Sequence, residues 1–196
     1  MSREILSDND LDLIFRTARS YNGYQDKPVT EVQIRAIYDL LKMGPTSANC
    51  QPARFIFCMS QNAKDRLADC AGGTNPEKIR KAPAAVVIGT DMEFYEKLPQ
   101  LFPHAPDAKN WFKGRNAEAM AFRNSTLQGA YFIIAARAIG LDTGPMSGFD
   151  NAKVDEAFFA DTTIKSNFIS TFGYGDTSTI LPRLPRLSFE EAAQIL

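Results

Sequence analysis

The feature that most restricts how this chain can fold is a long helix, which the sequence predicts over residues 116–139. A helix of this length is roughly 36 Å long at a rise of ~1.5 Å per residue, and Gly140 ends it because glycine suits the left-handed turn after a helix. The second half of the helix, GAYFIIAARAI, is apolar on almost every side. Apolar surface left in water costs about 25 cal/mol per Å², so this half must be covered all round. In a chain of 196 residues, we expect a dimer interface to supply part of that cover.

A second helix is predicted over residues 30–43. Its apolar side chains recur at the spacing of one helix face, at Ile34, Ile37, Tyr38 and Leu41. Thr30 and Gln33 form a capping box at its start, and the Gly-Pro pair at 44–45 ends it, because proline cannot continue a helix. A second capping box, formed by Ser188 and Glu191, predicts a helical turn near the C-terminus.

Short apolar runs predict the strands. The runs at 55–59 and 84–88 are bounded by polar or proline-containing stretches, which is typical of strands buried on both faces. A helix is predicted between them at 63–71, and a third strand at 164–172 leads into a glycine turn at 173–175. Helices outnumber strands and clean βαβ units are few, so the pattern indicates a mixed α/β protein rather than a doubly wound sheet. From the length, we expect residues 1–196 to form a single domain.

Composition argues against several classes of partner. Charged residues make up 23% of the chain and leave a net charge of -1, which provides no basic surface for nucleic acid. No apolar run reaches the roughly 20 residues of a membrane span, and the start MSREILSDND is too polar for a secretory signal peptide. Cys50, Cys58 and Cys70 lack the CxxC spacing of a zinc site and suit buried thiols in a reducing compartment. We therefore expect a cytoplasmic protein that binds no nucleic acid, membrane or metal.

The sequence also lacks the common catalytic motifs. Its one histidine, His104, lies in the proline-rich segment 99–110, which leaves no histidine triad and no multi-histidine metal site. We expect this segment to break regular structure and to serve as a lid or a surface loop. The nearest approach to a dinucleotide-binding motif, GYGDTS at Gly173, lacks the third glycine, and no Walker loop is present. A Rossmann dehydrogenase is therefore disfavoured.

Four polar segments have the chemistry to hold an anionic, planar cofactor. They are ARSYN at 18–22, GPTSANCQP at 44–52, TGPMSGFD at 143–150 and RLPR at 183–186. Arginine clamps a phosphate, Ser and Asn bond hydroxyls or ring carbonyls, and backbone N–H groups beside glycine approach a flavin edge. Three of the segments also have a purely structural interpretation: RLPR as a solvated tail, GPTSANCQP as a turn after a helix, and TGPMSGFD as a connection in which Asp150 caps the next helix.

Taken together and in this order around the long helix, the four segments resemble the nitroreductase family of FMN enzymes over essentially the whole chain. The stretches KMGPTSANCQPARF, FRNSTLQGAYFIIAARAIGLDTGPMSGFD and RLPRLSFEEA resemble the branch that reduces malonic semialdehyde in bacterial pyrimidine degradation. The resemblance implies an α+β fold with a central mixed sheet flanked by helices, and a homodimer in which the long helix packs against its mate. It also implies that FMN lies at the dimer interface and that NADPH or NADH donates the electrons.

The resemblance assigns flavin-binding roles to residues of each segment. The N-terminal motif comprises Arg19, Ser20 and Asn22, and the basic pair at the phosphate comprises Arg183 and Arg186. The segment that reaches the flavin from the partner subunit contains Thr46, Ser47 and Asn49. The polar contacts to the isoalloxazine are Asn75 and Lys78, and the loop against the ring contains Pro145, Met146, Ser147 and Gly148. The chain departs from the family pattern at Ala18, where many relatives have arginine, and at Ser147, where many have glutamate.

The reaction implied by the resemblance is a ping-pong cycle, in which NAD(P)H gives hydride to the flavin and an aldehyde then takes it at its carbonyl carbon. The carboxylate of malonic semialdehyde needs a cation, for which Lys113, Arg115 and Arg123 are the candidates. No residue stands out as a general acid. Two other functions remain open on the same residues: a broad nitroaromatic or quinone reductase, and a non-catalytic flavin-binding protein.

Overall fold

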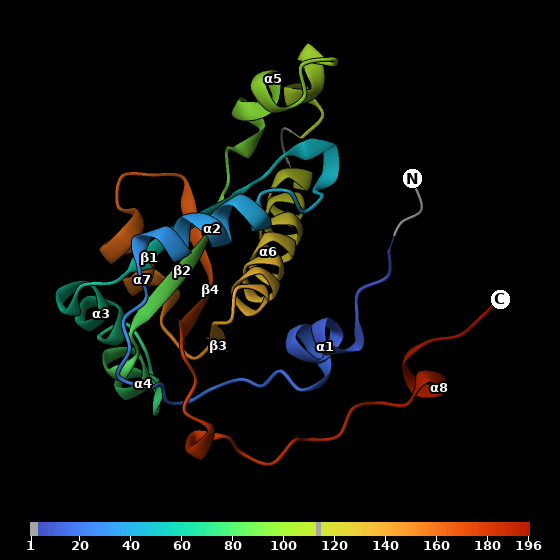
Figure 1. Ribbon diagram of the computed structural model, residues 1–196. Helices are drawn as coiled ribbons and strands as arrows, with labels where there is room; N and C mark the ends of the chain where they lie inside the picture. Colours follow the sequence, from blue (N-terminus) through green and yellow to red (C-terminus); the bar gives the residue numbers. More distant parts are fainter. Residues whose placement is uncertain (1–3, 113–114) are drawn as a thin grey trace.

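The computed structural model describes residues 4–112 and 115–196, the side chains of 115 and 116 excepted, and its centre is a four-stranded sheet in the order β1-β2-β4-β3 (Figure 1). The strands are β1 (Ala53–Cys58), β2 (Ala84–Asp91), β3 (Asp142–Met146) and β4 (Ile164–Gly173). They pair antiparallel throughout. The expectation of a mixed sheet is thus corrected for these strands, because parallel pairing in the described chain is confined to an isolated bridge between Ser20 and Thr143.

The central strand β2 is buried on both faces, as the sequence predicts. Val86 and Ile88 belong to the core on one face of the sheet, and Ala85 and Val87 belong to the core on the other. All four side chains are fully buried. A continuous apolar run therefore marks this strand because neither of its faces meets water.

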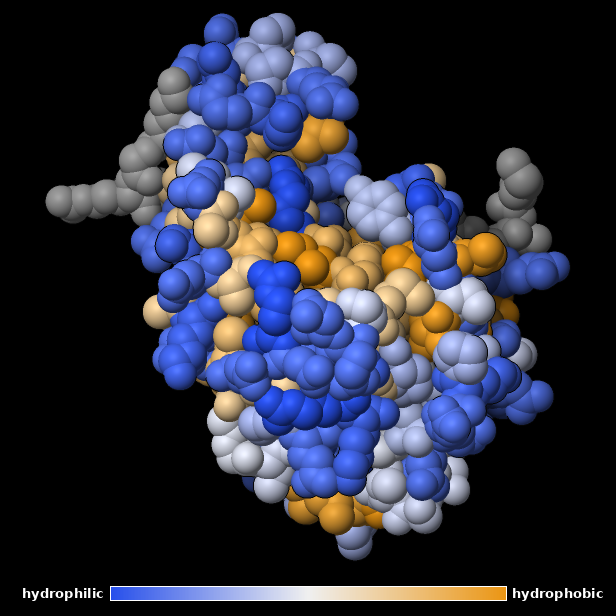
Figure 2. Space-filling model, turned by 90° about the vertical axis from the view of Figure 1, so that its left-hand side faces the viewer, coloured by the Kyte–Doolittle hydropathy of each residue, from blue (hydrophilic) through white to orange (hydrophobic). Residues whose placement is uncertain are grey.

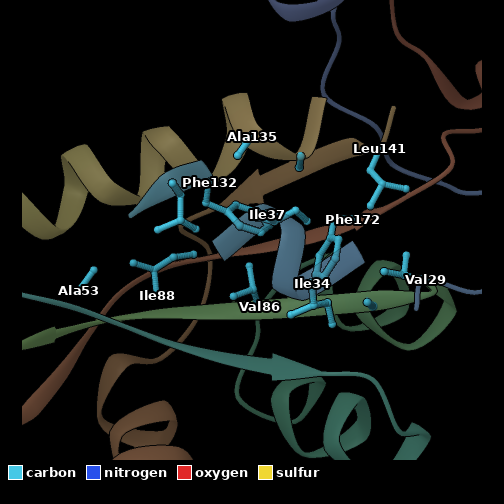
Figure 3. Packing of buried hydrophobic residues seen from close by; sticks show 13 residues of the cluster. Val29, Ile34, Ile37, Ala53, Val86, Ile88, Phe132, Ala135, Leu141 and Phe172 are labelled. Atoms are coloured by element: carbon cyan, nitrogen blue, oxygen red, sulfur yellow. The ribbon is translucent and has the colours of Figure 1, made fainter. Parts of the chain in front are cut away.

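Two helices, α2 (Glu31–Leu41) and α6 (Arg115–Ala138), cover one face of the sheet (Figure 1). The core between helices and sheet includes Ile34, Ile37, Phe132, Val86, Ile88 and Phe172 (Figure 3). The predicted capping box holds the start of α2: the backbone N–H of Thr30 donates to Gln33 Oε1 at 3.0 Å, and the Thr30 hydroxyl accepts from the N–H of Gln33. Local capping and core burial thus agree on where this helix begins.

The opposite face is covered by α3 (Gln61–Ala68), α4 (Asn75–Lys81) and α7 (Asn151–Phe159). Their apolar side chains form a second core with the sheet, which includes Leu67, Ile79, Val154, Cys58 and Ile169. Asp150 accepts a hydrogen bond from the N–H of Lys153 at 3.2 Å and so caps α7. The predicted capping of the next helix by Asp150 is confirmed, whereas residues 143–146 of the same segment belong to strand β3 rather than to a connection.

The long helix is confirmed in position but is covered differently from the prediction. It ends at Ala138, and Gly140 follows with φ of 81°, in the left-handed region. In its apolar second half, Phe132 and neighbouring alanines are buried by the sheet and α2 of the same chain. The large apolar side chains left exposed lie earlier in the helix, where Phe122 is 56% exposed and Leu127 is 42% exposed. The apolar half therefore needs less cover from a partner than expected, because the sheet lies beneath it.

Between β2 and α6 the chain forms a projection, drawn in green at the top of Figure 1. Its short elements are two 3-10 turns, Phe94–Lys97 and Pro106–Asn110, and the helix α5 (Leu98–Leu101). The buried residues Phe94, Leu98, Ala108 and Phe112 give this projection a small core of its own. The proline-rich segment is therefore more regular than predicted. His104 is exposed, and its ring centroid lies 3.9 Å from that of Phe102.

Both ends of the chain extend away from the sheet (Figure 1). Helix α1 (Asp8–Leu11) continues into a π-helical turn at Asp12–Arg16, and α8 (Phe189–Ala192) begins at the predicted capping box of Ser188 and Glu191. The exposed apolar residues of the C-terminal segment are Leu181, Leu184, Leu187, Phe189, Ile195 and Leu196. A single copy of the chain thus leaves this segment uncovered.

Two further observations bear on the predictions from composition. Cys50, Cys58 and Cys70 are free, buried thiols, as predicted, and burial raises the pKa of Cys50 and of Cys58 to about 11. Across the described ranges, the helices lack the combination of length and apolar character that crossing a bilayer requires.

Candidate functional site

The N-terminal motif lies against β3, a strand at the edge of the sheet. Ser20 forms the parallel bridge with Thr143, and the N–H of Tyr21 donates to the carbonyl oxygen of Thr143 at 3.0 Å. Pro145 has no N–H to donate, and an edge strand tolerates this because its outer side needs no ladder bond. The bridge brings the motif at 19–22 alongside a strand that the sequence does not predict.

The loop after β3 is joined to the start of α4. Asn75 Nδ2 donates to the carbonyl oxygen of Gly148 at 3.0 Å, and the N–H of Gly72 donates to the same oxygen at 3.0 Å. A Cβ on Gly148 would lie 2.7 Å from Asn75 Nδ2, so any larger residue would have to displace that amide. Lys78 follows one turn later in α4, half-buried and without an ion pair among the described residues. Asn75 and Gly148 therefore form one unit, whose role toward a cofactor stays a prediction.

Two arginines connect the N-terminal motif with the C-terminal segment. Arg183 Nη2 donates to the carbonyl oxygen of Ala18 at 3.0 Å, and Arg19 donates to the carbonyl oxygen of Leu181. Neither side chain forms an ion pair within the described residues. Four other arginines do pair with carboxylates: Arg16, Arg35, Arg54 and Arg80. We call the place where the N-terminal motif meets the C-terminal segment, beside Arg19 and Arg183, the corner. Like charges there that have no counter-ion among the described residues favour an anionic ligand.

The second arginine of the C-terminal pair, Arg186, behaves differently. It is exposed, and its Nη1 donates to the carbonyl oxygens of Leu184 at 3.0 Å and Pro185 at 3.1 Å, within its own segment. No hydrogen bond joins it to the corner at Arg19 and Arg183 in the described chain. In one copy of the protein, the RLPR segment is thus an exposed tail anchored by its first arginine.

The segment after α2 has a strained backbone. Ala48, Asn49 and Gln51 have φ of 49°, 50° and 39°, in the left-handed region that residues other than glycine rarely adopt. The hydrogen bonds that hold the segment include Gln51 N–H to Thr46 Oγ1 at 3.2 Å, Ser47 N–H to Asn124 Oδ1 at 2.8 Å, and Asn49 Nδ2 to the Leu101 carbonyl at 2.9 Å. Backbone strain of this kind costs on the order of 1–3 kcal/mol per residue and clusters at functional sites.

This strained segment does not join the group along β3 within one chain. Ser47 is bonded to Asn124 in the first half of α6, whereas β3 follows the end of that helix at Ala138 (Figure 1). The helix between Asn124 and Ala138 is about 21 Å long at 1.5 Å per residue. The structure therefore separates Thr46, Ser47 and Asn49 from the other predicted flavin residues.

Sequence reasoning missed Arg137, which reaches the same corner as Arg19 and Arg183. Its Nη1 donates to the carbonyl oxygen of Ile14 at 3.0 Å, and its Nε is buried without an acceptor among the described residues. The signal was available, because Arg137 is the only charged residue in GAYFIIAARAI, and a charge on an apolar helix needs a partner.

The arrangement fits a flavin mononucleotide. Arginines without carboxylate partners suit its phosphate, the amide of Asn75 and the close backbone at Gly148 suit a planar ring, and the hydroxyls and amides of the N-terminal motif suit its ribityl chain. Thr143, the bridge partner of Ser20, also has a buried Oγ1 that finds no hydrogen-bond partner in the described part of the chain. The donor set therefore matches each of the three chemical parts of the molecule.

The predicted cations for a substrate carboxylate are only partly placed. Lys113 lies outside the described residues, as does the side chain of Arg115. Arg123 is exposed on α6 and lines a surface groove of 590 Å³ together with Ala119, Phe122, Thr126, Leu127 and Ala130. Of the three candidates, Arg123 alone has a described side chain, and that side chain is on a largely apolar surface.

Comparison with known proteins agrees with this reading of the fold. The model of the Nitroreductase family matches residues 15–174. A protein of Stenotrophomonas maltophilia, provisionally named NADH dehydrogenase/NAD(P)H nitroreductase, is 58% identical over 187 residues, which cover 94% of this chain and 95% of that protein. A protein of Polynucleobacter asymbioticus with the same provisional name is 52% identical over 194 residues, which cover 98% of each chain.

Similarity of fold extends to solved structures of low sequence identity. A crystal structure from Exiguobacterium sibiricum 255-15, of a provisionally named nitroreductase in complex with FMN, has a TM-score of 0.85 at 19% identity and covers 100% of both chains. The family match covers most of the chain, and the α+β sheet with its flanking helices is the fold of these structures. The chain therefore belongs to the nitroreductase family.

Proposed function

We propose that this protein is a cytoplasmic, homodimeric FMN oxidoreductase that uses NADH or NADPH to reduce malonic semialdehyde to 3-hydroxypropionate in pyrimidine catabolism. The observation that carries the flavin proposal is the pair Arg19 and Arg183 beside the edge strand β3, which have no carboxylate partner among residues 4–112 and 115–196. The names of the relatives support the nicotinamide donor, and the FMN complex of similar fold supports the flavin. The substrate depends on the resemblance of three stretches to the malonic semialdehyde branch.

When bound, FMN supplies hydride transfer between a nicotinamide and an acceptor, and the protein's own residues bind and orient the reactants. In this proposal the residues at the phosphate are Arg19, Arg183 and Arg186, and those at the ribityl hydroxyls or ring carbonyls are Ser20 and Asn22. The residues at the isoalloxazine are Asn75, Lys78, Pro145, Met146, Ser147 and Gly148. The partner subunit supplies Thr46, Ser47 and Asn49.

Three features of a single chain support the dimer. The exposed side chains of Phe122 and Leu127 line an apolar groove on α6, and the C-terminal segment carries exposed leucines along its length. A second groove, of 430 Å³, is lined by Tyr38, Phe55, Phe57, Leu101 and six polar or small residues at the β1 edge. Figure 2 shows apolar residues, in orange, gathered across the middle of the visible face, below the projection. A second copy would cover such surfaces and would bring its strained segment 46–49 to the first copy's β3.

Subunit mixing tests whether the site is shared between two chains. Arg183→Ala and Asn49→Ala each remove a group from the proposed site, and each homodimer is expected to oxidise NAD(P)H poorly. If Arg183 and Asn49 serve one site from different subunits, each mixed dimer has one intact site. Random mixing should then restore about a quarter of the sites, by the two-fold symmetry of the dimer. No recovery in a mixture shown by mass to contain mixed dimers would mean that both residues act within one chain.

Absorbance tests whether the protein binds a flavin and which nucleotide reduces it. The purified protein is expected to show flavin absorbance that NADH or NADPH bleaches without oxygen, and the faster of the two identifies the preferred donor. A colourless protein that added FMN does not change would refute flavin binding, and a bound flavin that neither nucleotide reduces would indicate a non-catalytic binding protein.

The alternative enzyme is a broad nitroaromatic or quinone reductase, which the names of the relatives favour. The two enzymes are separated by comparing kcat/KM for malonic semialdehyde with that for a nitroaromatic on the same flavin-loaded preparation. We expect the aldehyde to be the better substrate. Faster reduction of the nitroaromatic would replace the aldehyde proposal with the alternative.

A further inference from the structure

Three arginines from separate parts of the chain tie the end of α6, the N-terminal segment and the C-terminal segment to one another. Arg137 lies in the last turn of that helix, Arg19 in the N-terminal segment and Arg183 in the C-terminal segment. Arg137 donates to the backbone of the N-terminal segment at Ile14, and Arg183 donates to the same segment at Ala18, both at 3.0 Å. Burial of the guanidinium lowers the pKa of Arg137; the carboxylate of Asp142 opposes this effect, and the charge of Arg183 adds to it.

Ordinary structural roles explain only part of the placement of Arg137. A positive charge in the last turn interacts favourably with the helix dipole, and the bond to Ile14 fixes the N-terminal segment. Neither role uses Nε, which is buried without an acceptor among the described residues. A buried donor on a charged group that has no acceptor is costly, and such groups in folded proteins often indicate a missing ion or ligand.

The counter-charge at this corner is small. Within the described chain, none of the three arginines forms an ion pair with a carboxylate. Asp142 is the acidic group facing Arg137 from β3, and its Oδ2 accepts from the N–H of Gly175 at 3.0 Å instead. Burial raises the pKa of Asp142, although the bond from Gly175 and the charge of Arg137 both act to lower it. Asp142 thus offsets the charge of Arg137 only in part, and the nearby charge of Arg183 has no carboxylate partner among the described residues.

We propose that Arg137 is a further phosphate-binding residue, and that it binds the phosphate monoester of the flavin together with Arg19 and Arg183. This inference rests on the proposed function, because it names an additional residue of the same site. A phosphate monoester carries close to two negative charges at neutral pH, so it offsets the repulsion among three guanidinium groups better than the single carboxylate does. Arg137 thereby links the end of the long helix to the cofactor.

The comparison of FMN with riboflavin tests this role directly, because the two flavins differ only by the phosphate. The dissociation constants of both are measured by flavin fluorescence on full-length, flavin-free protein. Arg137→Gln should raise the Kd of FMN at least about tenfold, the effect of losing a hydrogen bond to a charged group, and should change that of riboflavin less than about twofold. Arg137→Lys keeps the charge and should recover most of the preference for FMN. Arg35→Gln is the matched control, since Arg35 pairs with Glu31 on α2 and should change neither constant.

The outcomes separate the inference from the proposed function. Equal weakening of FMN and riboflavin by Arg137→Gln would make Arg137 a positioning residue for the N-terminal segment and would overturn the inference. Unchanged FMN binding, or an Arg137→Lys variant as weak as Arg137→Gln, would also overturn it. Failure of the unsubstituted protein to bind either flavin would instead refute the proposed function. If Arg137→Gln does not fold, the ratio of the two constants in Arg137→Lys and in Arg137→Met decides the matter.

Discussion

Gly129 of α6 lies against the ring of Phe168 in β4, so closely that a Cβ at position 129 would be 2.4 Å from Phe168 Cε1 and 2.5 Å from Cζ. No side chain fits there unless the ring or the helix moves. Glycine is otherwise a poor residue for the middle of a helix, by about 1 kcal/mol relative to alanine. The close approach of helix and sheet at this point helps to bury Phe132, one turn later in α6.

Gly129→Ala is therefore expected to destabilise the protein although alanine favours helix. Overpacking should lower the free energy of unfolding by about 1–3 kcal/mol, measured by urea denaturation. Phe168→Leu removes part of the ring, so the double variant should lose less than the sum of the two single losses. A single variant as stable as the unsubstituted protein would show that the ring moves aside freely.

Gly148→Ala should weaken flavin binding with little loss of stability. The new Cβ would displace the side-chain amide of Asn75, whose Nδ2 donates to the Gly148 carbonyl oxygen at 3.0 Å. This amide is a proposed contact of the flavin ring. Losing one such neutral hydrogen bond costs about 0.5–1.5 kcal/mol, or roughly a twofold to thirteenfold rise in Kd. Gly72→Ala is the control in the adjoining loop before α4, since its Cβ would find its nearest neighbour, the Gly148 carbonyl oxygen, at 3.9 Å. Equal effects of the two substitutions would argue against a contact through Asn75.

The buried cysteines should resist alkylation in the folded protein. With the pKa of Cys50 and Cys58 at about 11, only about one thiol in a thousand is a thiolate at pH 8, and the thiolate is the reactive form. Burial also raises the pKa of Cys70. Iodoacetamide at pH 8 should therefore label none of the three quickly, whereas all three should react once denaturant is added. Fast labelling of the folded protein, read by mass spectrometry, would contradict the buried positions.

Asp142→Asn should stabilise the protein more at neutral pH than at acid pH. Burial raises the pKa of Asp142 in the folded state above its unfolded value, so folding favours the protonated form. The favourable contribution is fully present below the unfolded pKa and is lost as the pH rises through the folded pKa. Asparagine stays neutral and can still accept from the N–H of Gly175. The gain in free energy of unfolding should thus increase between pH 4 and pH 7, and a constant gain would rule out this titration.

The elements that the sequence predicts best are those whose signals are local. Thr30 and Gln33 cap α2 as expected, since the capping box needs only four consecutive residues. The run around Val86 and Ile88 predicts β2, because burial on both faces leaves an uninterrupted apolar stretch. The family and its fold also follow from motifs read in order along the chain. These features depend on neighbours in sequence, which is why no tertiary information is needed.

Tertiary structure decided the rest. Residues 142–146, DTGPM, have no strand pattern and form β3 because β4 offers them a ladder, with Pro145 opposite Ser170. The long helix was predicted, but only the packing of the sheet under Phe132 shows which of its faces is already covered. The contacts that Arg19, Arg137 and Arg183 make between segments could not be predicted either. Arg19 is more than a hundred residues from the other two, and two strands and a helix separate Arg137 from Arg183. Local chemistry thus determined the elements of this protein, whereas long-range contacts determined which charges face one another, since electrostatic partners depend on distance in space and not along the chain.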